Sequence, residues 1–174
     1  NAASDAFLYV VVNEQWQPLQ VYLHTLADTD NPDPCVFTEQ DTSCRVDIGL
    51  SQSEAYVFIS SGGHTNNEVY VLPRADLTAP PQLMQAKQDD VEYYPDHGNG
   101  QFVIRSKLAM ANFAIYTCNE DALDSSQWTL KVASDSRHYI TGHLVLADYL
   151  IVTERVDGLD QIHVFASDGT DNYI

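Results

Sequence analysis

The hexapeptide Phe7-Leu-Tyr-Val-Val-Val12 decides the fold, because similar segments return three more times at a nearly constant distance. Its counterparts are Ala55-Tyr-Val-Phe-Ile-Ser60, Gln101-Phe-Val-Ile-Arg-Ser106 and Asp148-Tyr-Leu-Ile-Val-Thr153. All four are rich in β-branched and aromatic residues, which favour strands. Their aromatic anchors, Tyr9, Tyr56, Phe102 and Tyr149, are separated by 47, 46 and 47 residues, so the chain contains an internal repeat.

Three further strand patterns keep the same period. The strand after each anchor is expected at Gln20–His24, Glu68–Leu72, Asn112–Tyr116 and Gln161–Phe165, across turns at Asn13–Pro18, Ser61–Asn67, Lys107–Ala111 and Arg155–Asp160. The next strand is expected at Cys35–Thr38, Gln82–Gln85 and Trp128–Lys131. A strand ahead of the anchor is expected at Arg45–Leu50, Asp90–Tyr94 and Thr141–Leu146. Each unit is therefore predicted to be a four-stranded antiparallel meander.

Four-stranded units that repeat every 40 to 50 residues are typical of a β-propeller. The sequence predicts an all-β fold: a partial β-propeller of about three and a half blades and 14 strands, with blade units near 1–40, 41–88, 89–133 and 134–174. Residues 1–174 would then be part of one propeller domain. Because both end blades would be incomplete, we expect exposed apolar blade faces and self-association through them.

Composition narrows the possible functions. The chain has 174 residues, 44% hydrophobic, with 8 Lys+Arg against 25 Asp+Glu for a net charge of −17. This charge repels phosphate backbones and anionic lipids, which argues against nucleic-acid and membrane partners and leaves short basic peptides possible. The longest apolar run, Phe7–Val12, is far too short to span a bilayer.

The cysteines and the first residues bear on the cellular setting. Cys35, Cys44 and Cys118 are odd in number and lack Cys-x-x-Cys spacing, which favours reduced, buried thiols and a cytoplasmic location. A Cys35–Cys44 disulfide is the alternative. The opening Asn1-Ala2-Ala3 has no Met and no leader pattern, which indicates a segment of a longer protein.

We predict no catalytic, cofactor-binding or metal-binding residue in this chain. No Gly-x-Ser-x-Gly motif occurs, and Ser60-Ser61-Gly62-Gly63-His64 is expected to form a mobile hairpin connection rather than a catalytic pair. The six histidines, at 24, 64, 97, 138, 143 and 163, lack metal-ligand spacing. Asp28–Asp33 lacks the glycine and distant glutamate of a calcium loop, so it is expected to cap a turn.

A further group of charged residues recurs near the ends of the anchor strands. Arg105, Lys107, Glu154 and Arg155 could therefore share one face of the propeller. The simpler interpretation is that they form salt bridges at its rim, each stabilising the fold by less than about 1 kcal/mol.

An ordered series of segments resembles the propeller of oligopeptidase B (protease II), in the prolyl oligopeptidase family of serine peptidases. The segments are Tyr56–Gly62 leading to Asn67-Glu68-Val69; Asp90–Tyr93 with Asp96-His97; Phe102–Arg105 followed by Asn112-Phe113; and His143–Val152 followed by Glu154-Arg155 and Gly158-Leu159. Their spacing agrees with that propeller along most of Leu26–Phe165. Pro95 and Lys107-Leu108-Ala109 depart from the usual pattern.

The resemblance implies a non-catalytic role. In this family a seven-bladed propeller acts as a lid and size filter over a separate α/β-hydrolase domain that carries the catalytic Ser, Asp and His. The parent protein would be a serine-type endopeptidase cleaving short peptides after Lys or Arg, and this chain would be no enzyme alone. Its partners would be the hydrolase domain and the remaining blades. The alternative is a free-standing propeller scaffold that binds another protein.

Overall fold

A computed structural model describes residues 5–174 as antiparallel strands with one short 3-10 helix. The opening Asn1-Ala2-Ala3 therefore lies outside the described residues. The chain divides into two compact units, residues 1–88 and 89–174, and each is described by itself. The predicted all-β fold class is confirmed.

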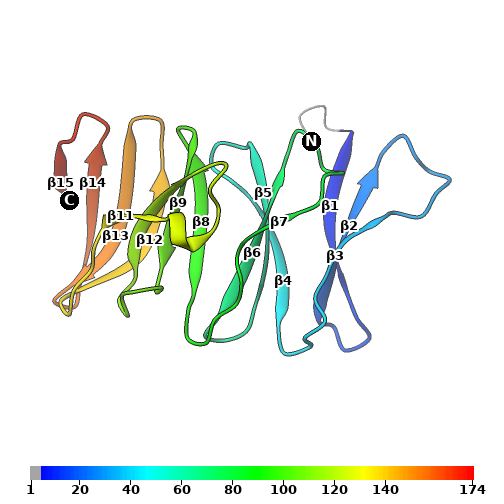
Figure 1. The fold of residues 1–174 in the computed structure, drawn as a ribbon, viewed down its shortest axis with the longest axis horizontal. Coiled ribbons are helices and arrows are strands. Elements are labelled where there is room, and N and C mark those ends of the chain that lie inside the picture. Colours follow the sequence, from blue (N-terminus) through cyan, green and yellow to red (C-terminus); the bar gives the residue numbers. More distant parts are fainter. Residues whose placement is uncertain (1–4) are drawn as a thin grey trace. The chain divides into compact units, whose positions relative to one another are not determined.

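The first unit contains two sheets of sequentially adjacent strands (Figure 1). One is β1 (Ala6–Val12), β2 (Pro18–Thr25) and β3 (Cys35–Thr38); the other is β4 (Arg45–Leu50), β5 (Tyr56–Gly62), β6 (Asn67–Pro73) and β7 (Gln82–Gln85). Every pairing is antiparallel, as in a meander. The two anchor segments form β1 and β5, the strands that pair with β2 and β6.

The core of the first unit lies between its two sheets. Strand alternation sends Val21 and Leu23 of β2 to the same face. Val21 clusters with Val46 and Ile59, and Leu8 and Val10 pack against this cluster. Leu23 clusters with Leu72 and Leu77. Each side chain of this size stabilises the fold by about 1.5 to 3 kcal/mol on full burial, so these clusters hold the two sheets together.

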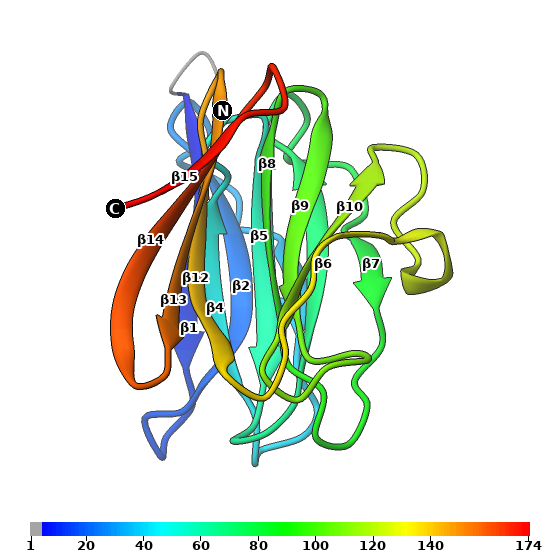
Figure 2. The same cartoon turned by 90° about the vertical axis from the view of Figure 1, so that its left-hand side faces the viewer.

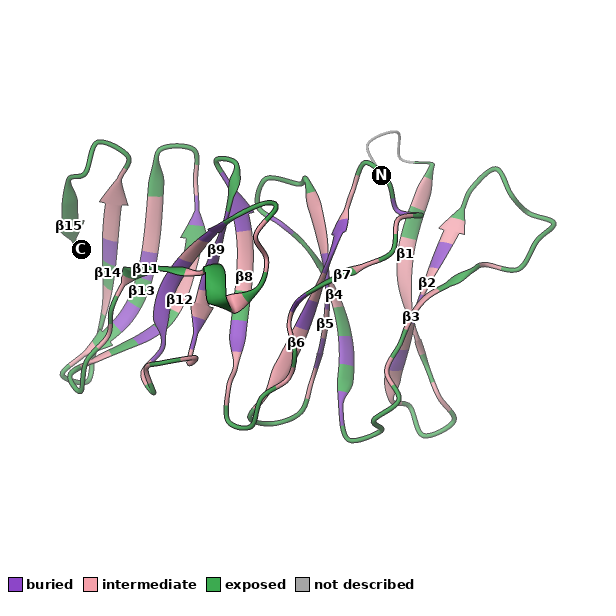
Figure 3. Cartoon of the chain, viewed as in Figure 1, coloured by how far each residue is buried: buried purple, intermediate pink, exposed green. Residues whose placement is uncertain are grey.

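The second unit repeats the arrangement, and Figure 2 shows β8, β9 and β10 side by side. Its sheets are β8 (Tyr93–Gly98), β9 (Gln101–Ser106), β10 (Ala114–Asn119) and β11 (Thr129–Val132), then β12 (His138–Val145), β13 (Tyr149–Val156), β14 (Leu159–Ala166) and β15 (Asp171–Tyr173). The 3-10 helix Ser125–Gln127 precedes β11, and Asp124 caps it. Figure 3 shows that β11 and β15 carry no buried residue.

The core of the second unit also lies between two sheets. Val103 and Ile115 cluster with Ile140, Val145 and Val152. The two sheets pack closely at Gly98 of β8, where a Cβ atom would lie 2.6 Å from Cγ1 of Val145. A larger residue at position 98 would therefore force Val145 or the strand to shift.

The predicted strand at Asp90–Tyr94 was placed too early in the chain. The observed strand is β8, Tyr93–Gly98, and it contains Pro95. Proline is tolerated because β8 is the edge strand of its sheet. Lys107 donates its backbone N–H to the carbonyl of Glu92 at 2.9 Å, so the backbone groups of Glu92 point to β9. Because successive residues of a strand direct their backbone groups to opposite sides, the nitrogen of Pro95, three residues later, points away from β9.

Two other details of the predicted strands were wrong. The fourth sheet has a final strand, β15, so the described residues form 15 strands rather than 14. Asp171-Asn-Tyr173 is too short and polar to be recognised from its composition. Ser60, Ser61 and Gly62 end strand β5 instead of lying in a hairpin loop, and Ser61 is fully buried.

The cysteine predictions were partly right. All three thiols are free, so the Cys35–Cys44 disulfide is not formed. Cys44 and Cys118 are buried as expected, whereas Cys35 is exposed at the start of the edge strand β3. The predicted burial of Cys35 failed because the outermost strand of a sheet has one neighbour only.

Candidate functional site

The serine–histidine stretch of the first unit does not form a nucleophile and base. Ser61 donates its hydroxyl hydrogen bond to Glu39 Oε2, while His64 is exposed in the turn that follows β5. A catalytic serine needs a neighbouring base that can accept its proton and a third group that orients the base. Ser61 instead belongs to a charged cluster with Glu39, Glu68 and Lys87.

This cluster joins the residues that follow β3 and β7 in the chain. Lys87 Nζ lies 2.7 Å from Glu39 Oε2, 3.8 Å from Glu68 Oε1 and 3.4 Å from the sulfur of Cys44. Burial alone would raise the pKa of Glu39, but hydrogen bonds from Lys87 and Ser61 outweigh burial and lower it. One ammonium group thus faces two carboxylates, and the cluster ties the residues after β3 to those after β7.

The acidic stretch Asp28–Asp33 caps turns. Asp28 Oδ1 accepts hydrogen bonds from the backbone and side-chain amides of Asn31, at 3.2 and 3.0 Å. Asp33 accepts one from the hydroxyl of Tyr9 at 2.8 Å and lies 3.0 Å from His24 Nδ1. No group of three or more His, Cys, Asp or Glu residues suited to a metal ion occurs within residues 5–174.

Arg105 of β9 is not a rim salt bridge. Its guanidinium carbon lies 4.5 Å from the centre of the Tyr94 ring and 4.2 Å from that of Phe113. Nη1 donates to the carbonyl of Ile140 at 3.2 Å, which links the two sheets of this unit. The sequence gives no sign of this stack, because Tyr94 and Phe113 come from different strands and loops.

Two of the other charged residues do form ion pairs. Lys107 Nζ lies 2.5 Å from Glu92 Oε1, and Arg155 Nε lies 2.9 Å from Asp160 Oδ1. Glu154 differs from them, because its side chain is only 4% exposed and its Oε1 lies 3.6 Å from Nδ1 of the nearly buried His163, so its contact is not at an exposed rim. The rim interpretation thus holds for Lys107 and Arg155 and fails for Arg105 and Glu154.

The feature best suited to binding is an open sheet edge in the first unit. Strands β4, β8 and β12, called inner strands below, each precede an anchor strand and pair with it. The anchor strand β1 pairs with β2 alone among the described strands. The backbone N–H of Leu26 donates to the Asp5 carbonyl, and that of Asn13 donates to the Gln17 carbonyl. The odd-numbered residues of β1 therefore direct their backbone hydrogen-bonding groups to β2. Leu8 and Val10 therefore direct their backbone groups to the open side.

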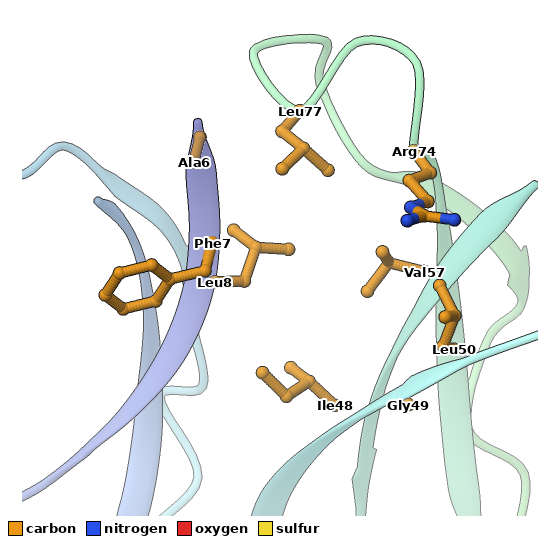
Figure 4. A pocket seen from close by; sticks show the side chains of 9 residues that line it. All are labelled: Ala6, Phe7, Leu8, Ile48, Gly49, Leu50, Val57, Arg74 and Leu77. Carbon is orange, nitrogen blue, oxygen red and sulfur yellow. The ribbon is translucent and has the colours of Figure 1, made fainter. Parts of the chain in front are cut away.

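An apolar pocket of about 260 Å³ lies beside this edge. Residues 6–8 of β1 and 48–50 of β4 line it, with Val57, Arg74 and Leu77 (Figure 4). In Figure 4 the side chains of Leu8, Ile48 and Val57 point into the gap, while the Phe7 ring points away. Arg74 is already paired with Glu54, at 2.6 Å, so the pocket offers apolar surface rather than a free charge.

Antiparallel four-stranded meanders that repeat every 46 or 47 residues are the blades of a β-propeller. The family model that describes the prolyl oligopeptidase N-terminal β-propeller domain matches residues 1–173. The chain belongs to that family. Its parent proteins are serine peptidases whose catalytic domain lies outside the matched propeller.

Named relatives agree with this assignment. Protease 2 of Moraxella lacunata is 26% identical over 160 residues, which covers 92% of this chain and 23% of that protein. Dipeptidyl aminopeptidase BI of Pseudoxanthomonas mexicana is 28% identical over 156 residues, covering 89% of this chain and 21% of that protein. The chain thus spans about a quarter of the length of these relatives.

Solved structures share the fold. Oligopeptidase B from Leishmania major superposes with a TM-score of 0.87 at 17% identity, covering 98% of this chain and 25% of that one. Oligopeptidase B from Trypanosoma brucei, with covalently bound antipain in a closed form, gives 0.84 at 19% identity, covering 93% and 23%. The resemblance to an oligopeptidase B-like propeller is confirmed. Within residues 5–174, no helix has the length and apolarity needed to cross a membrane.

Proposed function

We propose that this chain is the lid and size filter of a serine oligopeptidase that cleaves short peptides after Lys or Arg. The observation that carries the proposal is the match of residues 1–173 to a propeller domain that accompanies a peptidase domain. A propeller narrows the approach to a site placed against one end of its channel, so an unfolded peptide can pass and a folded protein cannot. The chain itself supplies no catalytic group to this reaction.

Charge supports the preference for basic peptides. The net charge of −17 attracts cations, and a channel with low-dielectric walls focuses such a field. Asp47 is exposed on the inner strand β4, which would lie nearest the axis of a closed propeller. On this proposal, Asp47 acts on a passing Lys or Arg side chain.

The test of the lid role uses both this chain and its parent polypeptide. The chain alone is expected to leave an arginine ester intact and to resist labelling by serine-directed phosphonates. The parent is expected to cleave a short Arg-containing peptide and to spare the same sequence inside a folded protein. Turnover by the isolated chain, or a parent with no phosphonate-reactive serine, would overturn the proposal; the latter would favour the free-standing scaffold.

The test of charge uses a matched pair of variants of the parent. Asp47→Asn is expected to lower kcat/KM for a cationic peptide about threefold at low salt, with the effect disappearing at high salt. Glu14→Gln changes the charge equally in the exposed turn after β1 and is expected to have no such effect. Equal effects of the two variants would show that the inner strand has no special role.

A reducing compartment is consistent with this function. All three cysteines are free, and we propose a cytoplasmic location on that basis. Secretion of the parent protein into an oxidising compartment would contradict it.

A further inference from the structure

We propose that Arg105 of β9, together with Tyr94 and Tyr139 of the inner strands, forms a binding site for the carboxylate of a short peptide. The inference rests on the proposed function, which it deepens by naming the part of the peptide that this chain recognises. The second unit thus offers a place suited to binding in addition to the open edge of β1.

Arg105 differs from the other cationic residues in how its charge is matched. Within residues 5–174, five of the eight Lys and Arg residues form ion pairs with Asp or Glu. Two more, Arg45 and Lys131, are exposed to water. Of these eight residues, Arg105 alone is partly buried and has no carboxylate partner. Because a partly buried charge is costly without a partner, this arrangement points to an anionic ligand.

The guanidinium of Arg105 keeps most of its hydrogen-bond donors free. Its Nη1 donates to the Ile140 carbonyl at 3.2 Å, and this is its only hydrogen bond to the described residues. A guanidinium carries five N–H donors in a planar fork that matches the two oxygens of a carboxylate. The hydroxyl of Tyr139, which interacts electrostatically with Arg105, also has no hydrogen bond within residues 5–174. Donors from both side chains are therefore available to one carboxylate.

Aromatic rings hold the guanidinium in position. Cζ of Arg105 lies 4.5 Å from the centre of the Tyr94 ring and 4.2 Å from that of Phe113. The Tyr139 ring packs edge-on against Phe113, with 5.7 Å between the ring centres. Phe113 is buried and has a φ of +62°, which is strained for a bulky residue. Such strain is concentrated at ligand clamps and active sites, so the stack is suited to hold a cation ready for a ligand.

Glu92, whose charge reaches Arg105, is already matched by other groups. Its Oε1 lies 2.5 Å from Lys107 Nζ, and its Oε2 accepts a hydrogen bond from the Tyr94 hydroxyl at 2.6 Å. Both oxygens of Glu92 are thus occupied, and Lys107 balances its charge. Arg105 therefore leaves one unmatched positive charge here, although the whole chain carries −17. At close range this local charge outweighs the distant negative ones and favours an anion.

Tyr94 and Tyr139 place the site where a peptide can reach it. They lie on β8 and β12, the inner strands of the two sheets of this unit, and are 40% and 39% exposed. Inner strands would line the passage of a closed propeller. Every peptide with a free C-terminus ends in a carboxylate, and in a short peptide that group lies close to the bond that is cleaved. A site for this carboxylate would therefore select short peptides by binding as well as by size.

The first experiment compares peptides that differ only at the C-terminus. The parent polypeptide is given a series of short Arg-containing peptides of increasing length, each as the free carboxylate and as the carboxamide. We expect kcat/KM to be about tenfold higher for the carboxylate at the length that reaches Arg105. Arg105→Gln is expected to remove this preference. Equal values for the two forms at every length would overturn the proposal.

Two further variants test whether the preference belongs to this site. Arg155→Gln removes an equal charge from the exposed pair with Asp160 and is expected to keep the preference. Because Arg105 also links two sheets, Tyr139→Phe guards against a loss of folding, since it keeps the ring against Phe113 and removes only the hydroxyl. We expect it to reduce the preference about threefold. An unchanged preference in Tyr139→Phe, or an equal loss in Arg155→Gln, would contradict the proposal.

A binding measurement separates this inference from the proposed function. The Nε–Hε NMR signal of Arg105 is followed in this chain as N-acetylglycine or its amide is added. We expect a shift with the carboxylate only, and no shift of the Arg155 signal. No shift at Arg105 would overturn the site, even with a parent that cleaves peptides.

The remaining outcomes distinguish the source of the carboxylate. A shift at Arg105, combined with a parent that cleaves no peptide, would support the site and overturn the proposed function. A shift combined with a parent that treats both peptide forms equally would overturn the peptide as the ligand. It would instead assign the site to an acidic side chain elsewhere in the parent polypeptide.

Discussion

His143 on β12 shows how one side chain makes a sheet contact sensitive to pH. Its Nε2 lies 3.1 Å from the carbonyl of Val103 on β9 and donates to it in the neutral form. Burial lowers the pKa of His143; Asp96 acts to raise it and Arg105 to lower it further. The neutral imidazole is therefore the form that fits between the two sheets of the second unit.

The sign of the pH effect follows from this shift. Below pH 6.5 the unfolded chain binds a proton at His143 that the folded chain resists, so stability falls as the pH is lowered. We expect a loss of up to about 1.4 kcal/mol per pH unit from this group. Urea unfolding at pH 7.5 and 5.5 measures it. His143→Gln keeps a hydrogen-bond donor and does not titrate. Between pH 7.5 and pH 5.5 it is expected to lose less stability than the unmodified chain, and an equal loss would contradict the assignment.

The three thiols are expected to react at very different rates. Cys35 is exposed, whereas burial raises the pKa of Cys118 to about 11 and Cys44 is enclosed beside Lys87. Because the thiolate is the reactive form, iodoacetamide at pH 8 is expected to add one label to the folded chain and three to the unfolded chain, by mass spectrometry. Cys35→Ser serves as the control and should take no label when folded. Rapid labelling of Cys118 would contradict its burial.

At the scale of elements, Gly98 is predicted to control the packing of β8 on β12. A methyl group at this position would lie 2.6 Å from Val145 Cγ1, so Gly98→Ala is expected to destabilise the chain by about 1 to 3 kcal/mol in urea unfolding. Gly49 of β4 is the matched control, because a Cβ there meets nothing within 4 Å. Gly49→Ala should change stability by less than about 0.5 kcal/mol. Similar losses for both variants would mean that the contact at Val145 does not matter.

The sequence predicted the strands that carry a strong local pattern. The anchors Tyr9, Tyr56, Phe102 and Tyr149 all lie in the strands expected for them, and the edge strands at 35–38 and 82–85 begin and end as predicted. The pattern failed at β8 and β15, which are edge strands with proline or polar residues. An edge strand takes its structure from its one partner, so its own residues carry little signal.

Contacts across the repeat were less predictable than its strands. The Arg105 stack and the Glu39–Lys87 cluster join residues from separate strands and loops, at distances that a periodic pattern does not encode. The absence of a Gly-x-Ser-x-Gly motif was readable directly from the sequence. The open edge of β1 was readable only in part, because the repeat predicts four strands for each unit, whereas the pairing of β1 with β2 alone among the described strands is seen only in the structure.

At the scale of the whole molecule, the outer face of the first sheet is expected to drive self-association. Leu8 and Val10 face the core, so alternation sends Phe7 and Tyr9 to the opposite face, where Tyr9 stacks on Tyr22. Phe7 is 49% exposed. Since the net charge of −17 opposes association, added salt should strengthen it. Light scattering at micromolar concentration checks this, and a monodisperse monomer at every salt concentration would contradict it.

Pro95 on β8 has a consequence for what moves through the propeller. Its nitrogen lies on the side of the strand away from β9, where an ordinary residue would present a backbone donor. In a closed propeller that side is the wall of the passage. An extended peptide in that passage would find one fewer backbone hydrogen-bond donor at Pro95. It would therefore pair less readily with β8 as an added strand. If the proposed filter role holds, the wall beside Pro95 is thus better suited to transit than to capture.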